Sequence, residues 1–530
     1  MNKYLKNLVL LASFLLIVGS ANAADIISPV QSIDVYTGDN IIGAADGSRI
    51  DGAVEIVVNG KNREDIIGGH LSAVNGGTVG LSNVDSEGNI VDPDFNAVVV
   101  NINGGNIKQA ARSNNSNIGN SVIYGNILYN VNSGSIGIGS GYSADTMYLM
   151  PSGYYGQKGK FTSEVYGNVT LNIGSQNGST SDVFIGYDDG KNANGFVVAT
   201  GTSTVRGDVR VNMYSGSAGY VWSGSYGATI NGDTHILIDK NAAVTNYVLG
   251  GGSNISDTFS CDVLGSTNVT VRGSVGGDIY GSHYDSSRLG LVGGNVNVAI
   301  DGGSVKGDVY GAIGNIKGDV YISATNGAAI SGNISAGESD GADWTAGTTV
   351  GGSVLVSIGN AQVSGTIDGG NNVSGTKTIN FGTDTENYIG SNAIIISNFD
   401  NVKVSSGSAV KFGAPIDVSL LEVASGSSVA IAEGSKFGEL NIIFSEDFAT
   451  GDTLTFYMTD VFGESSTIVL SAIESSETSL LVTNSHGEEF NASLAGDGSI
   501  SVGAAIPEPS VCAAVLGAIA LGIAACRRRK

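Results

Sequence analysis

Side chains that could carry out acid–base or metal chemistry are few and far apart in this sequence. The densest group is Asp188-Asp189 with Lys191, within the turn-like segment Gly186-Tyr187-Asp188-Asp189-Gly190. Cleaving a polysaccharide needs two carboxylates at a working separation, or a base beside a metal-bridged uronate. Adjacent strand residues point to opposite faces, so this pair predicts an acidic turn rather than a catalytic pair. The four histidines are dispersed, and none has another His or Cys at metal-ligand spacing: His70, His235, His283 and His486.

Cysteine offers neither a disulfide framework nor a metal site. Cys512 and Cys526 lie in the C-terminal apolar segment, which leaves Cys261 alone in the rest of the chain. We expect Cys261 to be a small, partly buried residue, with intermolecular pairing or a reactive thiol as the alternatives. The chain also lacks an EF-hand loop and the Gly-Gly-x-Gly-x-Asp nonapeptide. Weak binding of divalent cations at the acidic surface is therefore the form of calcium binding that the sequence still allows. We therefore predict no catalytic residue, no metal site and no cofactor.

The C-terminal segment 506–530 is a functional element of a different kind, a segment that holds the protein at a membrane. Pro507-Glu508-Pro509 is followed by a wholly apolar segment over 511–526 and by the basic residues Arg527, Arg528, Arg529 and Lys530. A helix over 511–526 would be about 24 Å long at about 1.5 Å per residue, which is short for a hydrocarbon core of about 30 Å. The basic end keeps the C-terminus in the cytoplasm and places the body outside. The prolines lack amide donors and hold Glu508 in an extended linker, clear of the membrane.

This tail resembles the PEP-CTERM sorting signal, in which Pro-Glu-Pro, a short hydrophobic helix and an arginine-rich end follow one another. Pro507, Glu508, Pro509 and the segments 511–526 and 527–529 each match in that order. The resemblance implies recognition by an exosortase, a membrane cysteine peptidase or transpeptidase. It also implies removal of the tail and delivery to the surface or extracellular matrix of a Gram-negative-type bacterium. The resemblance covers only the tail, and an ordinary single-pass anchor is the alternative.

The N-terminus also indicates export. Lys3 and Lys6 precede an apolar run over 8–18, and Ala21-Asn22-Ala23 supplies the small residues of a signal-peptide cleavage site. Cleavage is predicted between Ala23 and Ala24, so residues 1–23 are a signal peptide and the secretion machinery is a partner. No cysteine follows the apolar run, so a lipoprotein anchor is not expected.

The body between these ends is acidic and glycine-rich. The chain has 49 acidic and 25 basic residues, and six of the basic ones lie in the signal peptide and the tail. Repulsion by phosphate therefore disfavours nucleic acid and anionic lipid as direct partners. The 80 glycines show no collagen period and accompany abundant Val and Ile, which predicts many short strands and tight turns rather than disorder.

A degenerate repeat supplies those strands. Residues 293–311 align without a gap with residues 351–369, and both windows have apolar residues at alternate positions and glycines at fixed points. Alternation indicates strands with one buried face. The same phrase recurs at irregular spacing: Gly52 with Val54, Ile56 and Val58; Gly125 with Ile127, Tyr129 and Val131; Gly167 with Val169, Leu171 and Ile173; Gly207 with Val209, Val211 and Met213; Gly232 with Ile236 and Ile238; Gly318 with Val320 and Ile322.

Asn or Asp follows the glycine in many copies of this phrase. A carboxylate or amide at that place can accept a hydrogen bond from the backbone of the turn. We expect these residues to be turn and ladder groups rather than ligands of a site. They are Asn126, Asn168, Asp208, Asp233, Asp308 and Asp319.

Stacking of the repeats decides the expected fold. One strand pair cannot bury its apolar face alone, whereas stacked copies build a continuous core. We therefore predict an all-β fold over 24–438, a right-handed parallel β-helix or solenoid with irregular loops; a propeller or a string of β-sandwiches is the alternative. The later phrases, 377–381, 394–404 and 421–429, resemble the rungs of autotransporter-type adhesin passenger domains. That resemblance is compositional, covers roughly residues 40–435 and implies no catalytic residue, and the sorting tail departs from that family's pattern.

The C-terminal part of the body has more charge and fewer glycines. Residues 439–494 contain strand-like phrases over 440–444, 453–458, 467–473 and 480–483. We predict a terminal β cap or small β domain that closes the open end of the repeat array. Residues 495–505 are predicted as a flexible linker to the tail, whose apolar segment would be the single transmembrane helix.

Two loops offer a candidate interaction surface. Residues 145–161 carry Tyr148, Tyr154 and Tyr155, and residues 216–227 carry Tyr220, Trp222 and Tyr226. Exposed aromatic rings can stack on sugars or dock proteins. Packing of these rings onto the solenoid is the interpretation that we favour.

These features predict a non-enzymatic, exported surface or extracellular-matrix protein that is structural or adhesive. The expected partners are an exosortase-type peptidase, the secretion machinery and the membrane, which holds the C-terminal helix at least transiently. An extracellular polysaccharide or a host or cell surface is the partner expected of an adhesive protein. A β-helix polysaccharide lyase or hydrolase is one alternative. A purely structural matrix or surface-layer protein without a specific ligand is the other.

Overall fold

The computed structural model divides the chain into two compact units, residues 1–377 and residues 378–530, and each is described by itself. The structure describes residues 26–27, 29–33, 40–44, 47–60, 70–74, 76–107, 110–114, 120–136, 149–150, 162–179, 183–185, 196–200, 202–226, 229–252, 261–284, 290–339, 345–382, 393–405, 408–424, 428–430, 435–443, 453–455, 479–483, 489–494 and 499–505.

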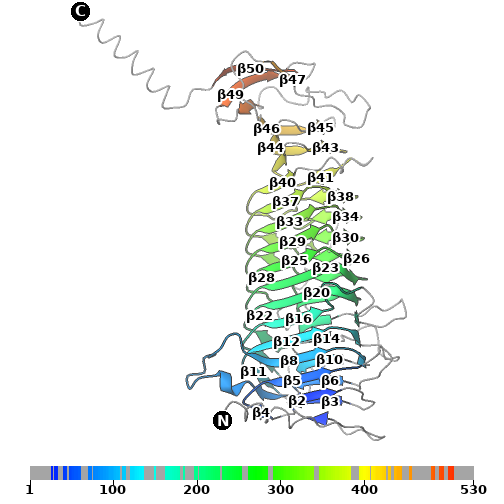
Figure 1. The fold of residues 1–530 in the computed structure, drawn as a ribbon. Helices are drawn as coiled ribbons and strands as arrows, with labels where there is room; N and C mark the ends of the chain where they lie inside the picture. The colour runs from blue at the N-terminus through cyan, green and yellow to red at the C-terminus, as the bar shows by residue number, and fades with distance from the viewer. Residues whose placement is uncertain are drawn as a thin grey trace, which may run out of the picture. The chain divides into compact units, whose positions relative to one another are not determined.

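The first unit is built from parallel strands that stack one above another in the order of the chain (Figure 1). Sheet 1 is the longest stack, and each of its strands pairs in parallel with the equivalent strand of the next repeat. Its strands are β2 (Val30–Ile33), β5 (Val54–Val58), β8 (Asn96–Ile102), β12 (Asn126–Val131), β16 (Val169–Ile173), β20 (Val209–Ala218), β23 (Thr234–Val244), β25 (Thr267–Val271), β29 (Val296–Asp301), β33 (Val320–Thr325) and β37 (Val354–Ile358). Short strands continue it alongside: β9 (Asn106–Ile107), β13 (Gly134–Ile136), β17 (Val183–Ile185), β26 (Ser274–Val275), β30 (Ser304–Val305), β34 (Ala328–Ile330) and β38 (Ala361–Val363).

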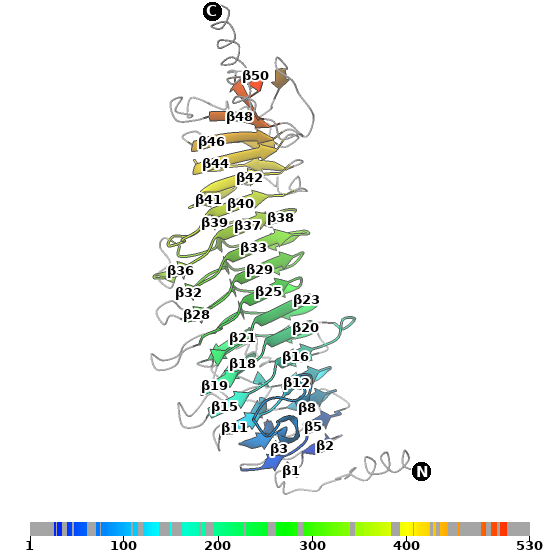
Figure 2. The ribbon, with the colours of Figure 1, turned by 90° about the vertical axis from the view of Figure 1, so that its left-hand side faces the viewer.

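Two further stacks complete the first unit, and Figure 2 shows both beside sheet 1. Sheet 2 contains β1 (Ile26–Ile27), β3 (Asn40–Ala44), β6 (His70–Val74), β10 (Ala110–Asn114), β14 (Leu149–Met150), β18 (Phe196–Thr200), β21 (Val221–Tyr226), β24 (Val248–Leu249), β27 (Ile279–Tyr280), β31 (Val309–Tyr310), β35 (Ile334–Ser335) and β39 (Thr366–Asp368). Sheet 3 contains β4 (Arg49–Ile50), β7 (Gly77–Val79), β11 (Ser121–Ile123), β15 (Thr162–Val165), β19 (Thr202–Val205) and β22 (Thr229–Ile230), then β28 (Leu291–Val292), β32 (Asn315–Ile316) and β36 (Thr349–Val350). Single bridges through Val263 join its two parts.

One passage of the chain through the three sheets makes one coil. The chain runs from β25 and β26 in sheet 1 to β27 in sheet 2 and β28 in sheet 3, and then starts the next coil at β29. This architecture is all-β, with long parallel sheets, and is consistent with a β-solenoid. The repeat windows that start at residues 293 and 351 lie two coils apart, because β29 pairs with β33 and β33 pairs with β37. Their irregular spacing arises in the loops, since the connection from β35 to β36 is longer than that from β31 to β32.

The core lies inside the coils and follows the predicted alternation. In β29, Val296, Val298 and Ile300 are buried while the residues between them are half-buried. Every apolar residue of the six glycine phrases given above is buried in the same way. Sheets 1 and 2 approach closely, because a Cβ added to Gly281 would lie 2.6 Å from Cγ2 of Val298. Burial of a Val or Ile side chain is worth about 1.5–3 kcal/mol, so repeated coils gain a continuous source of stability.

A ladder of polar side chains joins the coils at the corner before sheet 1. The backbone N–H of Asp319 donates to Oδ1 of Asn295 (2.8 Å), and Oδ1 of Asp319 accepts from the N–H of Ser353 (2.7 Å). A Cβ on Gly318 would lie 2.2 Å from the same Asn295 oxygen, so this corner has room only for glycine. The full ladder is Asn126, Asn168, Asp208, Asp233, Ser266, Asn295, Asp319 and Ser353, and a second one contains Asp278, Asp308, Asn333 and Thr366. The predicted ladder role of these Asn and Asp residues is therefore confirmed.

A second set of ladders lies on the outward face of sheet 1. The side-chain amide of Asn130 donates to Oδ1 of Asn101 (2.8 Å), Asn172 donates to Asn130 (2.9 Å) and Asn212 donates to Asn172 (2.9 Å). Stacked asparagine ladders of this kind satisfy the amides of successive strands at the parallel-strand spacing. They bind neighbouring coils together from the outside.

The second unit continues with parallel strands and ends in antiparallel ones. Parallel pairs join β40, β42, β44, β46 and β48, and β43 pairs with β45. β49 pairs in antiparallel fashion with β48 and β50, and β50 with β47. The elements are β40 (Lys377–Phe381), β41 (Ile395–Ser397), β42 (Asn401–Val404), β43 (Ala409–Lys411), β44 (Asp417–Ala424), β45 (Ser428–Ala430), β46 (Lys436–Ile443), β47 (Thr453–Thr455), β48 (Ser479–Thr483), β49 (Glu489–Leu494) and β50 (Ser499–Ala505).

Residues 495–505 differ from the linker that the sequence predicts. Residues Ser499–Ala505 form β50, a strand of this antiparallel sheet. The reason is a short alternation, in which Ile500 pairs with Leu494 and Val502 with Ala492. The predicted strand over 467–473 and the predicted helix over 511–526 lie outside the described residues.

Candidate functional site

Several groups of residues that the sequence singles out lie outside the described residues. These are the cleavage-site residues Ala21, Ala23 and Ala24, the tail residues Pro507, Glu508, Pro509, Arg527, Arg528 and Arg529, and the acidic turn with Asp188, Asp189 and Lys191. The same holds for Tyr148, Tyr154, Tyr155 and His486. The described part of the chain contains the remaining histidines, Cys261 and the aromatic residues of the second predicted loop.

The histidines are separate from one another in the fold. His70 begins β6 and His235 lies in β23, on the outward face of sheet 1, where burial lowers its pKa. His283 follows β27 and is 1% exposed. Its Nε2 lies 3.1 Å from the carbonyl oxygen of Cys261, and its Nδ1 lies 3.3 Å from that of Ile313. The imidazole therefore bridges two segments that are far apart in the sequence.

Cys261 and His283 meet at Gly290. A Cβ on Gly290 would lie 2.2 Å from Nε2 of His283 and 2.7 Å from Sγ of Cys261, so both side chains pack against the glycine backbone. A cysteine nucleophile requires a thiolate and an adjacent base. Here burial raises the pKa of the Cys261 thiol to about 12, and Nε2 of His283 faces the backbone carbonyl of Cys261. The pair is therefore a packing contact, in agreement with the predicted buried role of Cys261.

The burial of His283 predicts a loss of stability on acidification. Burial lowers its pKa below the usual value of about 6.5, although the Cys261 and Ile313 carbonyls and Asp262 favour the charged form. The unfolded chain therefore binds a proton first, and the stabilising effect is complete above pH 6.5 and decreases as the pH falls below it. The decrease reaches at most about 1.4 kcal/mol per pH unit.

Thermal unfolding between pH 7.5 and 5.5 checks this expectation. We expect His283→Asn to have a lower Tm at pH 7.5 and a flatter dependence of Tm on pH. His235→Asn is the matched control, because His235 is only half-buried and should change the slope less. An unchanged slope in His283→Asn would contradict the role of His283.

The second predicted aromatic loop is a strand. Residues Val221–Tyr226 form β21, and Tyr220 and Trp222 are 8% and 6% exposed. They belong to a buried cluster with Leu249, Tyr280, Tyr310 and Ile313. The favoured interpretation, that these rings pack onto the solenoid, is confirmed for Tyr220 and Trp222. The sequence did not show that side chains from four coils would gather at one place.

No protein-family model, curated protein or solved structure matches this chain. Among the described residues, no group of three or more His, Cys, Asp or Glu side chains could hold a metal ion. No helix within the described ranges is long and apolar enough to span a membrane. The site must therefore be judged from the geometry of this chain alone.

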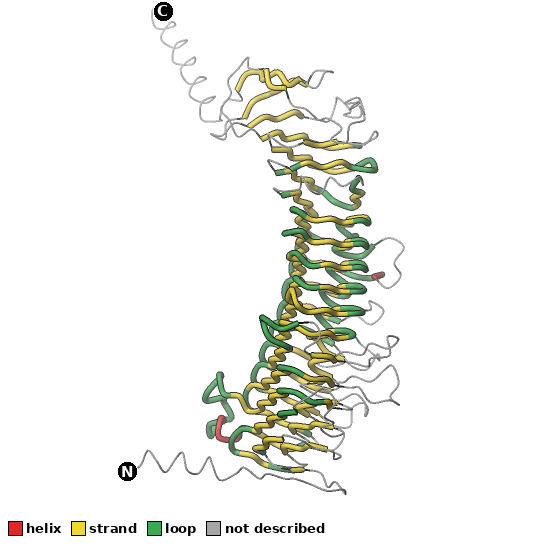
Figure 3. The backbone as a smooth tube through the Cα atoms, turned by 45° about the vertical axis from the view of Figure 1, so that its right-hand side comes forward, coloured by secondary structure: helices red, strands yellow, loops and turns green. Residues whose placement is uncertain are grey.

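A projecting loop between sheet 3 and sheet 1 was not singled out from the sequence. It holds η1 (Leu81–Asn83) and stands out from the stacked strands (Figure 3). Asn83 is 4% exposed, donates to the carbonyl of Asp92 (2.9 Å) and accepts from the Asp92 N–H (2.8 Å). Hydrogen bonds from the backbone and side chain of Asn89 lower the pKa of Asp85. The loop is thus fixed by its own polar contacts and exposes the side chain of Val91.

Proposed function

We propose that this chain is an exported, non-enzymatic surface or extracellular-matrix protein with a structural or adhesive role. The observation that carries the proposal is that the corner Asn and Asp side chains are engaged in hydrogen bonds between coils. In the first unit, the carboxylates and amides at the corners bind the backbone of the next coil. An enzyme on such a scaffold needs carboxylates that face a substrate instead.

The described surface of the first unit suits binding of a partner rather than catalysis. The outward face of sheet 1 carries asparagine ladders, and the loop with η1 presents a fixed acidic edge with Val91 63% exposed. An extracellular polysaccharide or a cell surface is the partner that this proposal names. A β-helix polysaccharide lyase or hydrolase is the rival function, and a matrix protein without a specific ligand is the second.

The finer parts of the fold belong to the same proposal. We assign the solenoid a right-handed path, because connections between parallel strands are almost always right-handed. The antiparallel strands β47–β50 would cap the repeat array, since an open sheet edge invites aggregation. Residues 511–526 would form the membrane helix and residues 506–530 the sorting tail that an exosortase recognises, as in the PEP-CTERM resemblance.

The mature protein isolated from the cell surface or matrix tests the whole proposal. Intact-mass measurement should place the N-terminus at Ala24 and show that the residues after the Pro507-Glu508-Pro509 motif are absent. The same preparation should bind members of a glycan or protein array and release no product from a panel of acidic and neutral glycans. Robust turnover of a glycan would favour the polysaccharide lyase or hydrolase instead. Absence of binding to every array member would favour the purely structural role. A retained C-terminus would make the tail a plain anchor.

A further inference from the structure

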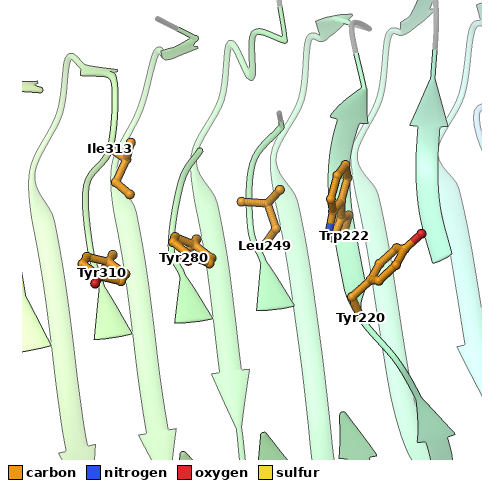
Figure 4. Packing of buried hydrophobic residues seen from close by; sticks show 6 residues of the cluster. All are labelled: Tyr220, Trp222, Leu249, Tyr280, Tyr310 and Ile313. Atoms are coloured by element: carbon orange, nitrogen blue, oxygen red, sulfur yellow. The ribbon is translucent and has the colours of Figure 1, made fainter. Parts of the chain in front are cut away.

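An aromatic column crosses the outward side of sheet 2. Trp222, Leu249, Tyr280 and Tyr310 occupy equivalent positions on β21, β24, β27 and β31, because Trp222 pairs with Leu249, Leu249 with Tyr280 and Tyr280 with Tyr310. Figure 4 shows these side chains on successive strands. The strand residues before them, such as Val248 and Ile279, are also buried. Sheet 2 is therefore covered by side chains on both faces at this place.

Tyrosine rings in this column and beside it form a continuous chain of contacts, which we call the tyrosine cluster. Tyr247 stacks on Tyr220, with ring centroids 5.5 Å apart and planes 11° apart. Tyr280 stacks on Tyr310 at 5.2 Å and 10°. Tyr284 joins the two parts, since it lies 5.8 Å from Tyr247 and 5.1 Å from Tyr280. An oxidising equivalent that enters the cluster at one ring can reach the others through these contacts.

Tyr284 is the ring at which this cluster meets solvent. It is 44% exposed, whereas Tyr280 and Tyr310 are 7% and 6% exposed. Tyr247 is half-buried beneath it. A reagent in solution therefore reaches the cluster at Tyr284, against which the half-buried Tyr247 stacks.

The buried tyrosines have a proton acceptor in place. Tyr280 donates its hydroxyl hydrogen to Oδ2 of Asp278 (3.0 Å), and Tyr310 donates to Oδ2 of Asp308 (2.9 Å). Loss of an electron from a phenol requires loss of its proton, and a hydrogen-bonded carboxylate accepts that proton without rearrangement. The cluster can thus pass an oxidising equivalent without trapping a charged phenol in the interior.

We propose that Tyr247 and Tyr284 form an oxidative coupling site, at which a peroxidase that uses hydrogen peroxide joins the two phenols as a dityrosine. Each tyrosine loses one electron and its phenolic proton to give a phenoxyl radical. The two radicals form one carbon–carbon bond between ring carbons next to the hydroxyl-bearing carbons. Each of these carbons then loses its hydrogen as a proton, and each oxygen regains one. One hydrogen peroxide accepts the two electrons and two protons and becomes two water molecules.

The geometry favours this pair over its neighbours. The Tyr247 and Tyr284 planes are 28° apart, so the ring edges can meet by sliding within the stack. Tyr280 meets Tyr284 at 68° and is 7% exposed, so its ring edge is less free to meet that of Tyr284. Tyr247 and Tyr284 also lie beside the adjacent strands β24 and β27 of sheet 2. The bond would therefore join neighbouring coils covalently and would restrict the unfolded chain over the segment between them.

Treatment of the dilute full chain with a haem peroxidase and hydrogen peroxide tests the proposal. Peptide mapping should find one intramolecular cross-linked species that contains Tyr247 and Tyr284 and lacks two hydrogen atoms relative to the separate peptides. Tyr247→Phe and Tyr284→Phe should each lose this species. Tyr321→Phe is the matched control and should retain it, because Tyr321 lies in a different coil from Tyr247 and Tyr284, is 37% exposed and donates to Asp319. Oxidation should also raise the Tm of the wild-type chain and leave the Tm of both phenylalanine variants at its starting value.

The variants remain informative because phenylalanine keeps the ring packing, which an unchanged Tm before oxidation verifies. Persistence of the cross-linked peptide in either variant would overturn the proposal. Dityrosine found only between molecules, or only between Tyr280 and Tyr284, would overturn it as well. None of these outcomes depends on whether the protein is adhesive, structural or enzymatic.

Discussion

Gly318→Val should destabilise the first unit by about 3 kcal/mol, at the upper end of the range for overpacking a close-packed site. The added Cβ would lie 2.2 Å from Oδ1 of Asn295 and 2.6 Å from the carbonyl oxygen of Gly294. The Asn295 oxygen cannot move away freely, because it accepts the hydrogen bond of the Asp319 N–H. The substitution therefore breaks a ladder bond and also displaces the backbone of the preceding coil. Chemical denaturation followed by circular dichroism measures the loss.

Gly52→Val provides the matched control for this substitution. Gly52 precedes Val54 with the same spacing as Gly318 precedes Val320, but a Cβ at Gly52 would meet no atom within 4 Å. We expect a change of less than about 1 kcal/mol there. Hydrogen exchange should show that the effect of Gly318→Val is greatest in β29, β33 and β37, since each coil contacts only its neighbours. Equal losses for the two variants would show that the corner ladder does not require glycine.

Local chemistry of the repeat made the coils predictable from the sequence. Alternation of apolar residues in β5, β12 and β16 identifies the buried face of sheet 1 without further information. Glycine followed by Asn or Asp marks the corner, because only glycine leaves room for the ladder oxygen. Both signals lie within a few residues of each other. They therefore specify the fold class and the role of Asp208 or Asp319 before any contact between coils is known.

Features that depend on stacking could not be predicted in the same way. Strands β24, β27 and β31 have two residues each, which is too short to show a period. The aromatic column exists only because these strands stack in register. His283 reaches the carbonyl of Cys261 across 22 residues, and loops of unequal length hide that spacing. The asparagine ladder of sheet 1 is also invisible in one copy, since a polar residue on an outward face indicates only exposure.

For the terminal segments, the sequence supports an interpretation where the structure offers no description. Their motifs, Ala21-Asn22-Ala23 and Pro507-Glu508-Pro509, lie outside the described residues, so their proposed roles in signal-peptide cleavage and sorting rest on the sequence alone. The sequence was a weaker guide at residues 495–505, where it predicts a flexible linker. There the alternation of Ile500 and Val502 produced a strand instead.

Val298→Asp should be the most damaging single substitution considered, with a loss of roughly 4 kcal/mol or more. Val298 is 2% exposed in β29, lies in register with Val269 and Ile322, and packs against Gly281, which follows β27 of sheet 2. A carboxylate at this position meets apolar side chains and backbone already paired within the sheets. It must either remain charged without a partner or take up a proton at a large cost. Loss of cooperative unfolding, or aggregation on expression, is the expected observation.

Ala299→Asp tests whether this effect comes from the side of the strand rather than from the strand itself. Ala299 is the next residue of β29, half-buried on the outward face, in register with Thr270 and Ser323. An aspartate there keeps access to water, so the expected change is below about 1 kcal/mol. A large loss in Ala299→Asp, or a small one in Val298→Asp, would mean that the alternation does not separate core from surface in sheet 1. Because the same alternation recurs in strands from β5 to β37, that result would also contradict the interpretation of the repeat as a stack of coils around one continuous core.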